Sequence, residues 1–304
     1  MDFGKVDDLS KVKFKLPADH ASTEKLLASL KKKKAAPHVY AGCAKWGRKE
    51  WLGSLYPKKT KEADFLKFYV KEFNSIELNA MFYRVFPKST VEKWGSFADD
   101  YFRFAPKMPQ IVTHIRRLKN VEKDTETILE SFSGFGDKMG HCFMQFDDRF
   151  APNAANIENL HKYLQFLPKD FKVAVEFRHP DWFQEKVEAE EGWDMLRQMK
   201  ASTVITDTAG RRDVLHMRLT TPTAFVRYVG NDGDPTDWKR IDEWSKRIAK
   251  WIDAGVDTVY FFMHTHEEKN SPRLSKYSIE KINKEAGLSI PLPRLLDDGE
   301  GKLF

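Results

Sequence analysis

The chain has 304 residues and a mass of 35.4 kDa, which fits two ordinary domains or one large barrel-type domain. Hydrophobic residues make up 41% and charged residues 32%, so the composition excludes a disordered or low-complexity protein. The net charge of +6 is too small to indicate a nucleic-acid partner by itself.

The first 36 residues form a basic N-terminal extension. This segment contains nine lysines, including the run from Lys31 to Lys34, and five acidic residues, so it holds +4 of the net charge. It has neither the apolar run of a secretory signal nor the composition of a transit peptide, and no stretch of the chain is apolar enough to span a membrane. Two cysteines without a CxxC motif favour a reducing compartment, so we expect a cytoplasmic protein with no membrane partner.

Short apolar runs alternate with helical segments from residue 39 almost to the end. Eight runs predict β-strands, at a spacing near 30 residues, which is the length of a βα unit. They are 39–46, 73–79, 102–108, 141–146, 172–177, 203–208, 225–229 and 258–264. No Gly-rich phosphate turn follows the first run, so the pattern favours an α/β protein with a single (β/α)₈ TIM-barrel domain over a doubly wound sheet. We expect the barrel at residues 37–288 and a C-terminal tail at 289–304.

Polar side chains stand at the predicted carboxyl ends of these strands, where TIM barrels build their active sites. Glu176 and Arg178 lie two apart, so both point the same way and can enter the mouth. In one interpretation Glu176 is a general acid or base, Lys107 stabilises developing negative charge and Asp207 completes the catalytic set. In the other interpretation Glu176 and Arg178 simply form an ion pair, which keeps the carboxylate ionised.

Further residues at these ends are candidates for ligand binding. Together they predict a positive, aromatic mouth suited to a small anionic or sugar-like ligand, through charge-assisted hydrogen bonds and stacking, with nucleic acid as a possible alternative. The candidates are Trp46, Glu77, Asn79, Tyr83, His114, Gln145, Arg178, His179, Trp182 and Arg227.

A divalent metal is a possible but less favoured cofactor. His264, His266 and Asp207 carry suitable ligand atoms for Zn²⁺ or Mn²⁺. Their spacing matches no compact metal motif, and charged residues after His266 suggest a solvated loop.

Several sequence runs resemble the YecE-like family, a domain-of-unknown-function group. The resemblance spans residues 39–277 and rests on the segments 42–51, 73–84 (FNSIELNAMFYR), 102–107 (FRFAPK), 111–114 and 175–183 (VEFRHPDWF). It implies a TIM-barrel fold and a distant likeness to sugar-isomerase and apurinic-endonuclease barrels, which use carboxylates and histidines with divalent metals. It also implies that Glu77, Asn79, Tyr83, Lys107, His114, Gln145, Glu176, Arg178, His179 and Asp207 lie at the mouth.

The chain departs from the family pattern at three turns, which puts a shared substrate in doubt. It has Gly42-Cys43-Ala44-Lys45-Trp46 in place of a Gly-Thr-Ser-Gly-Trp-like turn, Gln145-Phe146-Asp147-Asp148 in place of Gln-Leu-Pro-Pro, and 262–266 (FMHTH) in place of a Phe-Asn-Asn segment. Three functions remain open. They are a hydrolase or isomerase, a nucleic-acid-binding or endonuclease-like protein, and a non-catalytic ligand sensor.

Overall fold

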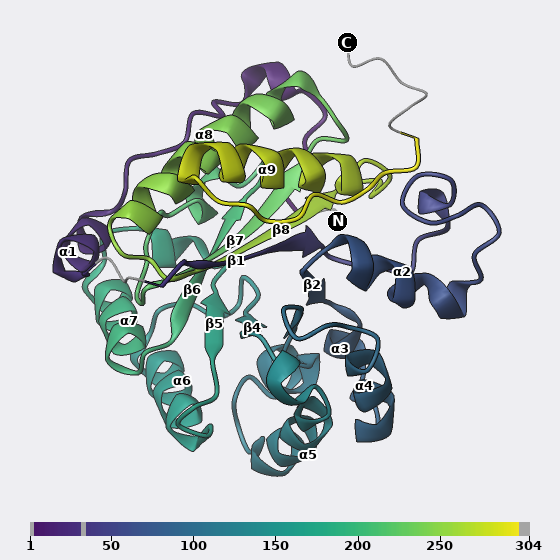
Figure 1. Cartoon of the computed structure of the whole chain (residues 1–304). Helices are drawn as coiled ribbons and strands as arrows, with labels where there is room; N and C mark the ends of the chain where they lie inside the picture. Colours follow the sequence, from purple (N-terminus) through teal and green to yellow (C-terminus); the bar gives the residue numbers. More distant parts are fainter. Residues whose placement is uncertain (1–2, 32–34, 298–304) are drawn as a thin grey trace.

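The computed structural model describes residues 3–31 and 35–297. The last three lysines of the 31–34 run and residues 298–304 of the expected tail therefore lie outside the described residues. Within the described part, eight strands alternate with helices along the chain, as the sequence predicts (Figure 1). The strands are β1 (His38–Cys43), β2 (Ser75–Leu78), β3 (Arg103–Pro106), β4 (Cys142–Gln145), β5 (Val173–Glu176), β6 (Ser202–Asp207), β7 (Thr223–Gly230) and β8 (Thr258–Thr265).

The strands do not close into one hydrogen-bonded barrel, so the prediction of a closed (β/α)₈ TIM barrel is wrong. Six parallel strands form one open sheet in the order β1-β8-β7-β6-β5-β4, and β2 and β3 form a separate two-stranded sheet. In the described part of the chain, β3 is connected to the β4 side by isolated bridges alone, such as Lys107 with Phe143. The fold is α/β, with an open arrangement of two parallel sheets.

Side chains occupy the seam between β1 and β2 and explain why no ladder forms there. The Asn74 side chain accepts from the Ala41 amide (2.9 Å) and donates to the Val39 carbonyl (2.8 Å). Tyr69 Oη accepts from the Cys43 amide (2.7 Å) and donates to the Ser75 carbonyl (3.0 Å). These side chains satisfy backbone groups that a strand ladder would otherwise pair, so β1 and β2 lie side by side without bonding directly.

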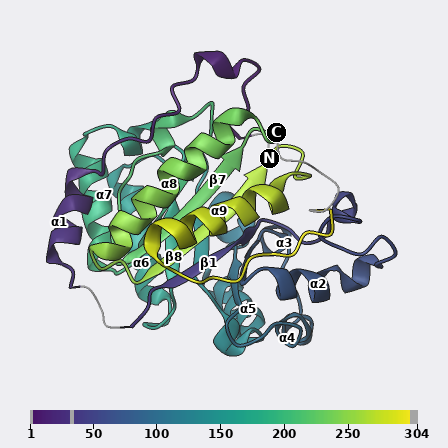
Figure 2. The same cartoon turned by 45° about the horizontal axis from the view of Figure 1, so that its top comes forward.

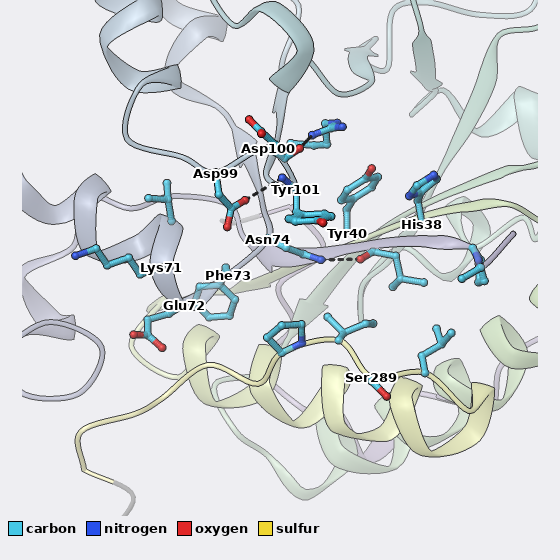
Figure 3. A pocket seen from close by; sticks show the side chains of 18 residues that line it. His38, Tyr40, Lys71, Glu72, Phe73, Asn74, Asp99, Asp100, Tyr101 and Ser289 are labelled. Atoms are coloured by element: carbon cyan, nitrogen blue, oxygen red, sulfur yellow. Dashed lines mark hydrogen bonds between the residues drawn. The ribbon is translucent and has the colours of Figure 1, made fainter.

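The amino-terminal end of this seam opens into a cavity of about 640 Å³ (Figure 3). Its walls include Tyr40, Phe73, Asn74 and Tyr101, and the segment 288–291 that follows the last helix closes one side. The cavity lies at the opposite end of the strands from the predicted functional residues.

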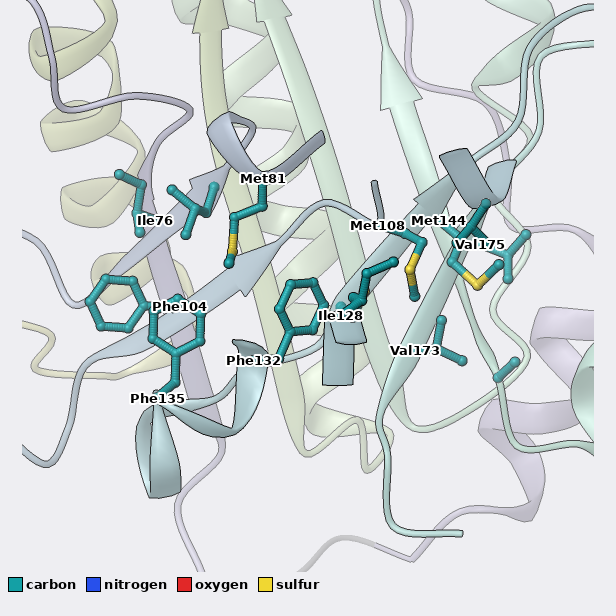
Figure 4. Packing of buried hydrophobic residues seen from close by; sticks show 14 of the residues in the cluster. Ile76, Met81, Phe104, Met108, Ile128, Phe132, Phe135, Met144, Val173 and Val175 are labelled. Carbon is teal, nitrogen blue, oxygen red and sulfur yellow. The ribbon is translucent and has the colours of Figure 1, made fainter. Parts of the chain in front are cut away.

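Helices cover the outer faces of both sheets (Figures 1 and 2). They are α1 (Ala21–Ser29), α2 (Phe65–Glu72), α3 (Ala80–Tyr83), α4 (Lys88–Gly95), α5 (Glu122–Ser133), α6 (Ala154–Phe166), α7 (Val187–Gln198), α8 (Pro235–Asp253) and α9 (Ser271–Ala286). Helix α5 buries Ile128 and Phe132 against Phe104 and Met144 from the strands (Figure 4). Along residues 3–31 and 35–297 no helix is long and apolar enough to cross a bilayer.

The N-terminal segment packs along the rest of the chain and buries several of its side chains. Leu16 and Leu27 join the same hydrophobic cluster as α8. The buried Asp19 carboxylate accepts hydrogen bonds from Arg247 (2.7 Å) and Trp251 (3.0 Å) of that helix. Helix α1 is anchored further by Thr23, whose hydroxyl donates to the Met217 carbonyl (2.9 Å).

The seam gives the first testable prediction. A Cβ on Gly42 would lie 2.0 Å from the Ser75 carbonyl oxygen and 2.6 Å from Tyr69 Oη, so Gly42→Ala must push the two sheets apart. We expect it to lower the free energy of unfolding by about 3 kcal/mol, measured by urea denaturation. Gly47→Ala is the matched control, because a Cβ there meets no atom within 4 Å, and it should change stability by less than about 0.5 kcal/mol. Equal stability of the two variants would contradict this account of the seam.

Candidate functional site

The period-two alternation of the strands gathers most of the predicted site residues inside the carboxyl end of the fold. A buried interior layer contains Ala105, Phe143, Ala174, Val204, Phe225 and Phe262. The residues two positions further along each strand point into the same interior, because strand side chains alternate between faces. This rule brings together Lys107, Gln145, Glu176, Thr206, Arg227 and His264, and Glu77 joins them from β2.

Arg227 stands at the centre of the cluster and is completely buried. It pairs with Glu77 through two hydrogen bonds, from Nε to Oε2 (2.9 Å) and from Nη2 to Oε1 (2.8 Å). Its Nη1 donates to Oε2 of Glu176 (2.7 Å). Burial alone would lower the pKa of Arg227, but the two carboxylates outweigh burial and raise it. Arg227 is therefore a fixed cation held between two carboxylates.

Both carboxylates are ionised for the same reason. Burial would raise the pKa of Glu77, but Arg227 and His264, whose Nε2 lies 3.0 Å from Oε2, hold it well below its ordinary value. Burial opposes ionisation of Glu176 too, yet Arg227, Arg178 and Lys107 lower the pKa of Glu176 to about 2. Oε1 of Glu176 also accepts from Arg178 Nε (3.1 Å) and the Thr206 hydroxyl (3.1 Å). Glu176 thus has the ion-paired environment that the second interpretation of the sequence describes.

Lys107 is buried next to this cluster, but its amine hydrogen-bonds to a neutral group. Nζ donates to Oε1 of Gln145 (2.7 Å) and lies 4.0 Å from the centre of the Phe82 ring. No carboxylate of the described residues forms an ion pair with it. Burial and the charge of Arg227 lower the pKa of Lys107 to about 7, although Glu176 opposes the shift. The amine is therefore partly neutral at physiological pH.

Arg178 lies at the edge of the cluster beneath the N-terminal segment. Its Nη2 is buried and has no hydrogen-bond partner within the described part of the chain. The Phe3 ring covers the guanidinium at 3.8 Å. That segment is held by the Thr208 hydroxyl, which donates to the Phe3 carbonyl (3.1 Å), and by the Gly210 amide, which donates to the Gly4 carbonyl (2.8 Å). The extension thus reaches the mouth.

A second cavity, of about 310 Å³, lies at the mouth between the loops that follow β1 and β2. Trp46, Asn79 and Tyr83 line it, and the Tyr83 side chain is 72% exposed. Nδ2 of Asn79 donates to Oε1 of Glu77 (2.7 Å), so this residue links the cavity to the buried cluster. His114 packs edge-on against Phe82 at 4.9 Å between ring centres, and burial lowers the pKa of His114 to about 4.

Four further candidates from the sequence lie outside the cluster, in addition to Trp46, Tyr83 and His114. Asp207 has the opposite strand parity from Thr206, so it points to the outer face, where Trp244 Nε1 (2.7 Å) and Arg240 bind its carboxylate. Trp182 is wholly buried and stacks on Phe177 at 3.6 Å.

The other two of these four candidates, His179 and His266, are histidines that lie just after the ends of strands. Nδ1 of His179 accepts from the Asp181 amide (3.1 Å) and caps a short 3₁₀ turn. His266 lies one residue beyond β8 and is half-buried. Within residues 3–31 and 35–297, no group of three or more His, Cys, Asp or Glu side chains is arranged to hold a metal ion.

Two residues of this site, Thr206 and Phe3, are not among the candidates that the sequence predicts. Thr206 follows from strand parity, since it lies two residues after the interior Val204. No pattern in the sequence predicts the contact of Phe3 with Arg178, because the two residues are 175 positions apart.

Comparison with known proteins places the chain in a family. The family model described as "Protein of unknown function DUF72" matches residues 40–295. The chain belongs to this family. The UPF0759 protein YecE of Escherichia coli (strain K12) is 25% identical over 264 residues, which cover 81% of this chain and 93% of YecE. The UPF0759 protein YunF of Bacillus subtilis (strain 168) is 28% identical over 151 residues, covering 48% of this chain and 52% of YunF. The resemblance expected from the sequence is thus confirmed.

Solved structures of DUF72 proteins share the fold. The DUF72 family protein EF0366 from Enterococcus faecalis V583 superposes with a TM-score of 0.64 at 18% identity, over 84% of this chain and 98% of that chain. The DUF72 family protein TM1631 from Thermotoga maritima MSB8 gives a TM-score of 0.61 at 22% identity, over 82% and 99%. The DUF72 match begins at residue 40, so Phe3 and α1 lie outside it.

The ionised cluster predicts a specific acid sensitivity. Since the folded-state pKa of Glu176 is about 2 against an ordinary 4.5, its contribution to stability is present above about pH 4.5 and is lost as the pH falls toward 2. We expect Glu176→Gln to remove this contribution, which is on the order of 3 kcal/mol. The difference in unfolding free energy between wild type and variant should therefore shrink between pH 5 and pH 2.5 in urea titrations. Glu126→Gln, on the exposed face of α5, should keep the wild-type pH profile.

Proposed function

We propose that the carboxyl-end mouth binds a small anionic ligand, such as a carboxylate or phosphate group, between Arg178 and Lys107. The observation that carries this proposal is the buried Nη2 of Arg178, which has no partner within the described chain. A buried guanidinium N–H without an acceptor is costly, and an anionic oxygen is the acceptor that it binds best.

The charge balance of the cluster supports the same ligand class. Arg227 uses its hydrogen bonds on Glu77 and Glu176, and Arg178 shares only one oxygen of Glu176, through Nε. Two carboxylates thus offset two guanidinium groups, and the Lys107 amine is left beside a neutral amide. An incoming anion would balance the amine when it is protonated and would reduce its repulsion with Arg227.

In this proposal Glu176 is a positioning residue for the two arginines. A carboxylate with a pKa of about 2 donates no proton near pH 7 and is a weak base, so its environment favours an electrostatic role over the general acid or base role expected from the sequence. Hydrolase or isomerase chemistry at the mouth would then need another proton carrier, and Lys107, with a pKa of about 7, is the best suited member of the cluster.

Sulfate titration tests the proposal. Bound anion should raise the wild-type melting temperature by about 2 °C or more at a concentration ten times its dissociation constant, because only the folded state binds it. Sulfate also stabilises proteins by exclusion from their surface, so the informative quantity is the difference between wild type and Arg178→Gln at equal sulfate.

Two further variants make this test specific. Arg197→Gln, on the exposed part of α7, should respond to sulfate as wild type does, and Arg178→Lys should retain part of the specific effect. Identical sulfate responses in wild type and Arg178→Gln, together with no saturable heat in calorimetry, would overturn the proposal.

A further inference from the structure

We propose that Lys107 forms a covalent imine with the carbonyl group of an anionic ligand held in the mouth. The inference deepens the proposed function and rests on it: Arg178 takes the anionic end of the ligand, and the amine of Lys107 attacks the carbonyl carbon. The ligand class is therefore a small aldehyde or ketone that carries a carboxylate or a phosphate group.

The surroundings of the amine are those that an imine-forming lysine requires. Lys107 is the residue after β3 and is only 6% exposed. Among the described residues, the amine donates one hydrogen bond, to Gln145, a neutral acceptor that orients the amine without fixing its charge. A carboxylate partner would hold the amine protonated and unreactive, and none of the described carboxylates pairs with it.

Neighbouring groups suppress protonation further. The Phe82 ring at 4.0 Å and the Phe143 ring at 5.8 Å exclude water from Nζ. The fixed charges of Arg227 and Arg178 repel an ammonium ion, while Glu176 and Glu77 partly offset them. A desolvated lysine beside another cation is a general way to obtain a neutral, nucleophilic amine near pH 7.

The proposed step balances without a co-reactant. The neutral amine adds to the carbonyl carbon, a C–N bond forms, and the carbonyl oxygen becomes a hydroxyl by taking a proton. The C–O bond then breaks, the oxygen leaves as water with a second proton, and the nitrogen remains as a protonated imine. Overall, one ammonium ion and one carbonyl give one iminium ion and one water. The positive iminium would sit in the place of the ammonium, beside Glu176.

Reductive trapping on the intact chain tests the step directly. The protein is incubated at pH 7 with sodium cyanoborohydride and one of three probes, and the modified lysines are mapped by peptide mass spectrometry. Pyruvate carries a carboxylate, glycolaldehyde phosphate carries a phosphate, and glycolaldehyde carries neither. We expect Lys107 to be labelled at least ten-fold faster than exposed lysines such as Lys123 by one or both anionic probes.

The variants and the uncharged probe separate this inference from anion binding. Lys107→Arg should lose the label, and Lys123→Arg should label at Lys107 as wild type does. Arg178→Gln should slow labelling by the anionic probes but not by glycolaldehyde.

The outcomes have distinct meanings. Specific sulfate binding without preferential labelling of Lys107 would overturn the imine while leaving the anion site standing. Lys107 could instead be labelled equally fast by glycolaldehyde and by the anionic probes, with no effect of Arg178→Gln. That result would support imine formation at Lys107 and overturn the recognition of an anionic group by Arg178. If every probe labels Lys107 no faster than Lys123, the proposal is overturned. This comparison is made on the wild-type protein, so it does not depend on whether Lys107→Arg folds.

Discussion

The buried pairing of Arg227 with Glu77 and Glu176 is the interaction on which the functional end of the fold depends. Glu77 belongs to the two-stranded sheet, whereas Glu176 and Arg227 belong to the six-stranded sheet. One guanidinium therefore connects two sheets that share no backbone ladder between β1 and β2. Removing it would leave two buried carboxylates without their main counter-charge, which typically costs several kcal/mol. The same ion pairs that organise the site also hold the two sheets together.

The two sheets are joined by side-chain contacts, because no strand ladder connects β1 to β2. Along β1, from Val39 to Cys43, the side chains of Asn74 and Tyr69 replace the missing ladder with hydrogen bonds. At the carboxyl ends, Arg227 and His264 reach across to Glu77. Side chains rather than a strand ladder therefore join the two sheets both along the seam and at the cluster.

Sequence patterns were sufficient for the eight strands and for most of the cluster, because both follow from local periodicity. Strand parity would have excluded Asp207 and added Thr206, since adjacent residues of one strand point to opposite faces. Local sequence periodicity does not show whether the eight strands close into one hydrogen-bonded barrel. The strand that contains Gly42 reads as an ordinary barrel strand, and only the tertiary packing of Asn74 and Tyr69 shows that no ladder joins it to β2. The burial of Trp182 also depends on tertiary packing, because its Nε1 donates to the Phe150 carbonyl (2.7 Å), 32 residues earlier in the chain.

The N-terminal segment lies outside the DUF72 match and still contacts the buried cluster. The cluster around Arg227 is built from residues within the DUF72 match, whereas Phe3 lies before it and covers Arg178. An aromatic face on a guanidinium stabilises the cation and excludes water from it, which strengthens its attraction for an anion at the remaining edge. The segment is held there because the Thr208 hydroxyl donates to the Phe3 carbonyl and the Gly210 amide donates to the Gly4 carbonyl. A chain that lacked this segment would present the same guanidinium to solvent. Under the proposed function, the affinity of the mouth for an anion would therefore depend partly on residues outside the family match.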